Sequence, residues 1–183
     1  GIIKVMDCIR QISEMREIAL FHANFHFQNS LPNPLNSHGS KCFSQSDEDG
    51  LTVQILSRIG HIDNGVFIEL GVGDGTENNT ILLRALGWRG FWVGGEDLAY
   101  PLTTRSEVFS FYKKWITKDN VIQIIQNGLE RMEESQADVI SIDLDGNDLY
   151  IAKEILSSGL RPKLFIVEYN GNYIPPIDWS IYY

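Results

Sequence analysis

Residues 66–75 read VFIELGVGDG, and this stretch decides the fold class of the chain. A short run of strand-forming residues leads directly into a loop with glycine at every second position, and a helix is predicted to follow over residues 77–86. Glycine allows a backbone to pass close beneath a ligand and to adopt dihedral angles that a Cβ atom disfavours. A strand, a glycine loop and a helix in this order predict a nucleotide-type cradle at the carboxyl end of the first strand of an α/β sheet.

The spacing and the charge of this loop indicate which ligand it suits. A dinucleotide-binding loop has its third glycine five positions after the first, whereas here the third glycine is Gly75 and Thr76 follows it. Asp74 and Glu77 would also repel a pyrophosphate group, which binds at an uncluttered helix N-terminus. S-Adenosylmethionine carries a sulfonium and an ammonium group but no phosphate, and it is the ligand that we expect. A tight turn without a ligand is the simpler alternative.

The candidate cofactor-binding residues of this region share a place at the end of the first predicted strand. They are Glu69, Gly71, Gly73, Asp74 and Gly75. We expect the carboxylate of Glu69 to accept a hydrogen bond from a cationic or hydroxylated group of the ligand.

Alternating strands and helices predict a Rossmann-like, doubly wound parallel sheet. After a helix over residues 46–58, capped by Ser46, the predicted strands are 66–70, 90–94, 111–116, 139–143 and 164–168. The predicted helices between them are 77–86, a loose one near 102–109, 119–133 and 148–157. These elements form one domain over residues 43–183. It is preceded by an extension over residues 1–42, for which we expect an amphipathic helix, Ile2–Phe21, and a loop.

Ligands of such sheets bind across the carboxyl ends of the strands, so the polar residues there are candidates. Glu96 follows the second strand and is expected to bind the ribose hydroxyls of an adenosine, with Asp97 in reserve. Thr117 follows the third strand, from where it could reach an adenine edge. Thr117 could equally be the N-cap of the next helix.

Two further strand ends bring oxygen ligands to the same rim. Asp143 and Asp145 follow the fourth strand, and Glu168 and Asn170 follow the fifth. A hard divalent cation such as Mg²⁺ prefers oxygen ligands, which Glu168 and Asn170 would supply together with Asp145 or Asp143. Alternatively, Asp143 or Asp145 acts as a general base toward a substrate hydroxyl. The third alternative is that residues 145–148 simply form a turn and a helix cap.

The composition limits the partners of the protein. The formal net charge of −9, without a cluster of Lys and Arg, argues against a nucleic acid. No apolar run is as long as a membrane span, and no signal-peptide pattern opens the chain. Cys8 and Cys42 lie far apart, so we expect no disulfide framework and a cytoplasmic location. We expect any homo-oligomer to form through a sheet edge or the N-terminal helix.

Several motifs in order resemble the FkbM-type methyltransferases. The similarity extends from about Phe43 to Pro176, and its segments read FSQSDEDG at 43–50, FIELGVGDG at 67–75 with Asn79-Thr80, GWRG at 87–90, SIDLDGND at 141–148 and VEYN at 167–170. The resemblance implies an S-adenosylmethionine-dependent methyltransferase with the class I fold, commonly one that methylates hydroxyl groups of sugars or natural products. The chain is similar more distantly to catechol O-methyltransferases, whose metal ligands lie at the ends of strands four and five.

The chain departs from the family pattern at two places. Gly94 and Gly95 stand where the family has its ribose-binding acid, so Glu96 is expected to act from further along the chain. The C-terminal helix and strand hairpin of the class I sheet are not found after Glu168, which predicts a truncated domain. The alternative functions are therefore a non-catalytic remnant that binds the cofactor or a partner and, disfavoured by the early third glycine, an NAD-binding oxidoreductase.

Overall fold

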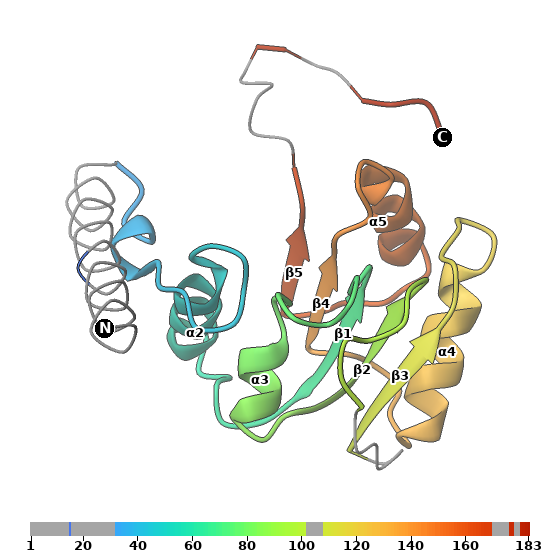
Figure 1. Cartoon of the computed structure of the whole chain (residues 1–183), viewed down its shortest axis with the longest axis horizontal. Helices are drawn as coiled ribbons and strands as arrows, with labels where there is room; N and C mark the ends of the chain where they lie inside the picture. The colour runs from blue at the N-terminus through green and yellow to red at the C-terminus, as the bar shows by residue number, and fades with distance from the viewer. Residues whose placement is uncertain (1–14, 16–31, 102–107, 170–175, 178–179) are drawn as a thin grey trace, which may run out of the picture.

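The computed structural model describes residues 15, 32–101, 108–169, 176–177 and 180–183 (Figure 1). Its centre is a five-stranded sheet in which all paired neighbours are parallel and the strand order is β3-β2-β1-β4-β5. The strands are β1 Val66–Leu70, β2 Arg89–Gly94, β3 Phe109–Lys113, β4 Val139–Ile142 and β5 Leu164–Val167. The predicted α/β class with a parallel sheet is confirmed, and the strand order is compatible with a Rossmann-like fold.

Helices α4 and α5 cover one face of this sheet. The helices of the described chain are α2 Glu48–Arg58, α3 Ile81–Ala85, α4 Val121–Arg131 and α5 Asp148–Ser157, preceded by the short 3₁₀-helix η1 Asn36–His38. Ile125 of α4 and Ile155 of α5 are buried in the same apolar cluster as Ile68 of β1. Helices α4 and α5 also pack against each other. Because all paired strands are parallel, the loops that lead from β3 and β4 into these two helices start at the same edge of the sheet.

Helices α2 and α3 cover the opposite face. Phe67 of β1 is buried there in a second apolar cluster with Leu56 of α2 and Leu83 of α3. Successive side chains of β1 thus point to opposite faces, and both faces are covered by helices, as is usual for a parallel sheet. The ends of the strands, and not their faces, are therefore left open to a ligand.

Three predicted boundaries are wrong. The helix predicted over residues 77–86 spans only Ile81–Ala85, because the backbone N–H groups of residues 79 and 80 donate to the Glu69 carboxylate. The third strand is Phe109–Lys113 and not 111–116, so Phe109 does not belong to the predicted loose helix, whose residues 102–107 lie outside the described chain. Ser46 does not cap α2: the N-cap is Asp47, and the Ser46 N–H donates to Glu48 Oε2 at 2.9 Å.

The predicted N-terminal helix, Ile2–Phe21, lies outside the described residues apart from Met15. Strands β3 and β5 form the two edges of the sheet. None of the described helices is both long and apolar enough to cross a membrane.

Candidate functional site

A cleft of about 660 Å³ lies at the carboxyl ends of the strands. It is lined by the loop after β1, by Gly94 and Gly95 at the end of β2, by residues 114–116 after β3, and by the ends of β4 and β5. The predicted site residues that line it are Glu69, Gly71, Gly73, Asp74, Glu96, Asp143, Asp145 and Glu168. Segments far apart in the sequence meet here because parallel strands bring their carboxyl ends to one edge of the sheet.

The glycines of the loop have different structural roles. Gly71 has φ +92°, and a Cβ atom there would lie 1.7 Å from the carbonyl oxygen of Asp143, so only glycine allows β1 and β4 to approach each other. Gly73 has φ +50°, and a Cβ atom there would meet nothing within 4 Å, so this position opens into the cleft. Gly75 is not in the cleft lining: it packs near Leu98, and its carbonyl oxygen accepts from the Tyr100 hydroxyl at 2.7 Å.

The carboxylate of Glu69 is buried beneath the loop and serves mainly the chain itself. Oε1 accepts from the Asn79 N–H at 2.8 Å, and Oε2 accepts from the Thr80 N–H at 3.1 Å and the Thr80 hydroxyl at 2.5 Å. The Thr80 oxygen in turn accepts from Trp92 Nε1 at 2.8 Å. Burial raises the pKa of Glu69 to about 7 despite these donors. Glu69 thus holds the glycine loop against α3, and few of its lone pairs are left for the predicted hydrogen bond to a ligand.

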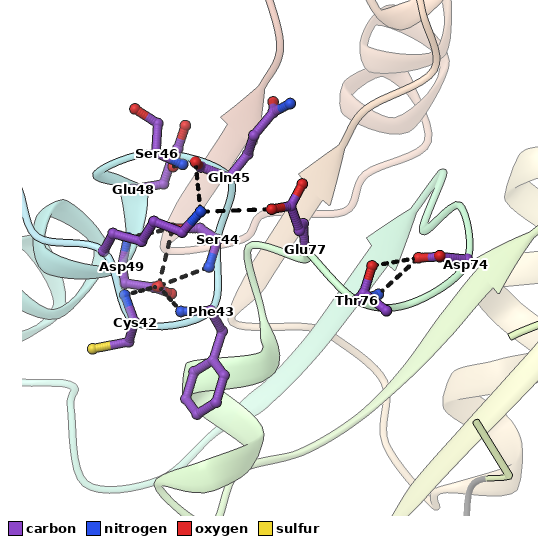
Figure 2. Close-up of polar contacts among 11 residues, drawn as sticks. Cys42, Phe43, Ser44, Gln45, Ser46, Glu48, Asp49, Asp74, Thr76 and Glu77 are labelled. Atoms are coloured by element: carbon purple, nitrogen blue, oxygen red, sulfur yellow. Dashed lines mark hydrogen bonds and ion pairs between the residues drawn. The ribbon is translucent and has the colours of Figure 1, made fainter. Parts of the chain in front are cut away.

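Asp74 and Glu96 present exposed carboxylates to the cleft. Asp74 Oδ1 accepts from the N–H and the hydroxyl of Thr76, at 3.0 and 2.6 Å, and these bonds lower the pKa of Asp74 (Figure 2). Glu96 lines the cleft beyond β2. Asp97 is instead paired with Lys113 at 2.7 Å and is not in the cleft lining. The geometry therefore favours Glu96 over Asp97 as a ligand-binding acid.

Three exposed carboxylates form what we call the acidic rim: Asp143, Asp145 and Glu168. One oxygen of each lies within 4.8 Å of the others, and no other such group of potential metal ligands is present in the described chain. Partial desolvation, and then the charges of nearby carboxylates, raise the pKa of Asp143. Partial desolvation and the charge of Asp143 raise the pKa of Glu168 to about 7. The predicted third ligand, Asn170, lies outside the described residues.

A buried side chain, Asp148, holds the loop that carries this rim. Its Oδ1 accepts from the Leu144 N–H at 2.8 Å, and its Oδ2 accepts from the Gly146 N–H at 2.9 Å. Between them Asp145 has φ +51°, a left-handed conformation that is uncommon outside glycine. The turn predicted for residues 145–148 is thus present, and it is formed in a way that leaves the Asp145 carboxylate exposed at the cleft.

A side chain that the sequence analysis did not single out, Gln45, reaches the cleft from the segment before α2. Oδ2 of the buried Asp49 accepts from three consecutive N–H groups, those of residues 42–44, and from the Ser44 hydroxyl, at 2.6–3.0 Å. Lys41 Nζ donates to the Gln45 carbonyl oxygen at 3.1 Å and pairs with Glu77 at 3.5 Å. Figure 2 shows the Gln45 side chain extending away from this turn. The sequence analysis used the motif FSQSDEDG, which contains Gln45, only for the family resemblance. It did not predict that Gln45 lines the cleft.

The end of β3 brings Trp115 to the cleft instead of Thr117. Because β3 ends at Lys113, residues 114–116 line the cleft and Thr117 does not. Thr117 is not the N-cap of α4 either: Asn120 is, and its Oδ1 accepts from the Thr117 N–H at 2.8 Å. Trp115 is 78% exposed, and its ring lies against Gly95. An exposed tryptophan at a cleft edge offers a face on which a planar base can stack.

No family model matches the chain, and no curated protein is similar to it. The family suggested by the sequence motifs therefore stays a prediction.

The charge of the cleft is strongly negative. Besides the predicted carboxylates, Glu77 also lines it, and Lys114 is the only cation among the described lining residues. A cleft walled by one sign of charge attracts ligands of the opposite sign and repels those of the same sign. The site can therefore accept a cationic ligand or a metal ion, but it disfavours a phosphorylated one.

Proposed function

We propose that the protein is an S-adenosylmethionine-dependent methyltransferase that methylates a hydroxyl group of a sugar or another small natural product. The observation that carries the proposal is the acidic cleft above an open, left-handed Gly73 at the end of β1. Its charge suits the sulfonium and the ammonium group of this cofactor better than the phosphates of NAD. The motif resemblance supports the same assignment.

The proposed binding mode assigns a part of the cofactor to each side of the cleft. The glycine loop and Asp74 bind the methionine portion, and Glu96 accepts from the ribose hydroxyls. Trp115 stacks on the adenine, because its ring is exposed at the same edge of the cleft as Glu96. The acidic rim then faces the remaining side, where the acceptor binds.

In the proposed reaction, Asp143 or Asp145 orients the acceptor hydroxyl and accepts its proton. S-Adenosylmethionine supplies the electrophilic methyl group when it is bound. The raised pKa of Asp143 makes its carboxylate a better base than an ordinary one. Alignment of the two reactants in one cleft contributes most of the acceleration.

Glycine 73 gives a direct test of cofactor binding. Gly73→Ala adds a methyl group inside the cleft, and we expect it to raise the dissociation constant of S-adenosylhomocysteine at least about tenfold in calorimetric titration. Gly60→Ala is the matched control, because Gly60 also has a left-handed φ, +68°, and also open space around its Cβ position, but it does not line the cleft. In both variants the left-handed backbone conformation costs alanine about 1 kcal/mol relative to glycine. Wild-type protein that binds no S-adenosylhomocysteine, or equal affinities of the two variants, would contradict the proposed function.

We also propose that the acidic rim binds Mg²⁺, since its donors are all carboxylate oxygens, the ligands this ion prefers. The residues that would hold it are Asp145 and Glu168, which leaves Asp143 as the base of the proposed reaction. A bound cation would lower the pKa of an acceptor hydroxyl. Millimolar Mg²⁺ is expected to raise the melting temperature of the wild type but not of Asp145→Asn. The control is Asp63→Asn, which changes an exposed carboxylate outside the cleft lining. An equal response of all three proteins would contradict the metal site.

A further inference from the structure

The last described residues, 181–183, lie on the carboxyl side of the sheet near α5 (Figure 1). The Ile181 carbonyl oxygen accepts from the Tyr150 hydroxyl at 2.5 Å. The Ile181 side chain packs over Gly146, since a Cβ atom placed on that glycine would lie 3.0 Å from Ile181 Cδ1. These contacts fix residue 181 on the first turn of α5 and on the loop before it, which carries Asp145.

Tyr183 connects the first turn of α5 to the loop between β3 and α4. Its hydroxyl oxygen accepts from the Lys118 N–H at 2.8 Å, and Lys118 Nζ lies 4.9 Å from the centre of its ring. The other side of the contact is an edge-to-face pair with Tyr150, whose ring centre is 5.4 Å away. Lys118 belongs to the loop between β3 and α4, in which Trp115 lines the cleft.

The two loops have no sheet ladder between them. Strands β3 and β4 are separated by β2 and β1, so no strand pairing joins the loops that follow β3 and β4 directly. In the described chain no hydrogen bond joins residues 114–118 directly to residues 143–150, and Lys118 Nζ lies 5.9 Å from the Tyr150 ring centre. Tyr183 contacts both groups at somewhat shorter range: its ring centre lies 4.9 Å from Lys118 Nζ and 5.4 Å from the Tyr150 ring centre.

We propose that Tyr183 is a positioning residue of the cleft: by contacting both Lys118 and Tyr150, it holds the Trp115 loop against the first turn of α5, next to the Asp145 loop, at the spacing that the ligand needs. The choice of S-adenosylhomocysteine as the ligand rests on the proposed function. The contacts of Tyr183 with Lys118 and Tyr150, however, are present in the ligand-free protein. A cation–π contact and an aromatic pair together provide enough free energy to bias two exposed loops, and neither contact needs the tyrosine hydroxyl.

The neighbouring tyrosine provides a matched control for the test. Tyr182 is 99% exposed, whereas Tyr183 is 56% exposed and makes the contacts described above. Tyr183→Ala is compared with Tyr182→Ala and with the conservative Tyr183→Phe, which keeps the ring. In ligand-free protein, Tyr183→Ala is expected to speed amide hydrogen exchange in residues 114–118 and 143–150. It is also expected to raise the dissociation constant of S-adenosylhomocysteine about fivefold, while the other two variants stay within about twofold of the wild type.

The outcomes separate this inference from the proposed function. If the wild type binds no S-adenosylhomocysteine, the proposed function fails, and the hydrogen exchange of the ligand-free variants still decides whether Tyr183 bridges the loops. Equal exchange in Tyr183→Ala and Tyr182→Ala would overturn the bridge. Faster exchange in Tyr183→Ala with unchanged affinity would overturn the positioning role, because the loops would then be tied without effect on the cleft.

Discussion

Replacement of Asp49 by alanine is expected to lower the free energy of unfolding by about 3 kcal/mol. A single carboxylate oxygen of this fully buried residue accepts from the N–H groups of Cys42, Phe43 and Ser44 and from the Ser44 hydroxyl. The alanine variant leaves all four donors without this partner. Hydrogen bonds to a charged group contribute about 1.5–3 kcal/mol each, but the four are not additive, because water can reach the half-buried N–H groups once the turn loosens.

Urea denaturation at neutral pH measures this effect, with Asp63→Ala as the control for losing an exposed carboxylate. The control is expected to stay within about 0.5 kcal/mol of the wild type. Asp49→Asn should fall between the two. It keeps one acceptor oxygen, but it places an amide group at Oδ1, which is buried and has no partner in the described chain. Equal midpoints for Asp49→Ala and Asp63→Ala would show that the turn does not depend on this carboxylate.

The stability of the protein is expected to fall as the pH rises from about 4.5 to about 7, and Glu69 is the main cause. Its pKa is about 7 in the folded protein, against an ordinary value of 4.5 in the unfolded chain, because burial disfavours the charged form. The folded state therefore binds more protons than the unfolded state between these two values, so unfolding becomes easier as the pH rises through them. The difference corresponds to about 3 kcal/mol of unfolding free energy, present below pH 4.5 and lost above pH 7.

The variant Glu69→Gln isolates this contribution. Its unfolding free energy should lack the part of the pH dependence that Glu69 causes. Any constant cost of replacing an acceptor oxygen with an amide group shifts the whole curve without changing its slope. Glu168→Gln is the matched control, since Glu168 also has a pKa raised to about 7 but lies exposed on the acidic rim, where solvent screens its contribution. Parallel curves for the wild type and Glu69→Gln would contradict the assignment of the slope to this residue.

The sequence predicted the elements of the sheet well, because local patterns determine them. The apolar runs at 66–70, 90–94, 139–143 and 164–168 correspond to β1, β2, β4 and β5 with small changes at the ends. The third strand was misplaced because its residues, FSFYK, give no clear apolar run and are followed by the equally strand-like Trp115 and Ile116. Helix α3 was predicted too long because the acceptor for its leading N–H groups, Glu69, lies in a different element.

The site was predicted in outline but not in its detailed roles. The rule that ligands bind at the carboxyl ends of parallel strands placed Glu96, Asp143, Asp145 and Glu168 in one cleft, and the structure brings them together there. The rule could not predict that Gly75 faces Leu98, nor that Trp115 takes the place expected for Thr117. Such differences depend on single-residue shifts at the end of a strand, which composition and periodicity do not resolve.

The sequence by itself determined the order of strands and helices along the chain and the glycine loop at the end of the first strand, because each follows from residues that are close together in the sequence. It also determined the negative net charge, which depends on composition alone. Only the tertiary structure decided what the polar groups do. Glu69 was expected to meet a ligand, and it is instead a buried acceptor for Asn79 and Thr80. Gln45 lines the cleft, and Tyr183 contacts the loop that carries Trp115, only because the folded chain brings segments that are distant in the sequence together. The physical reason is that burial and hydrogen-bond partners depend on neighbours from distant segments, which the local sequence does not specify.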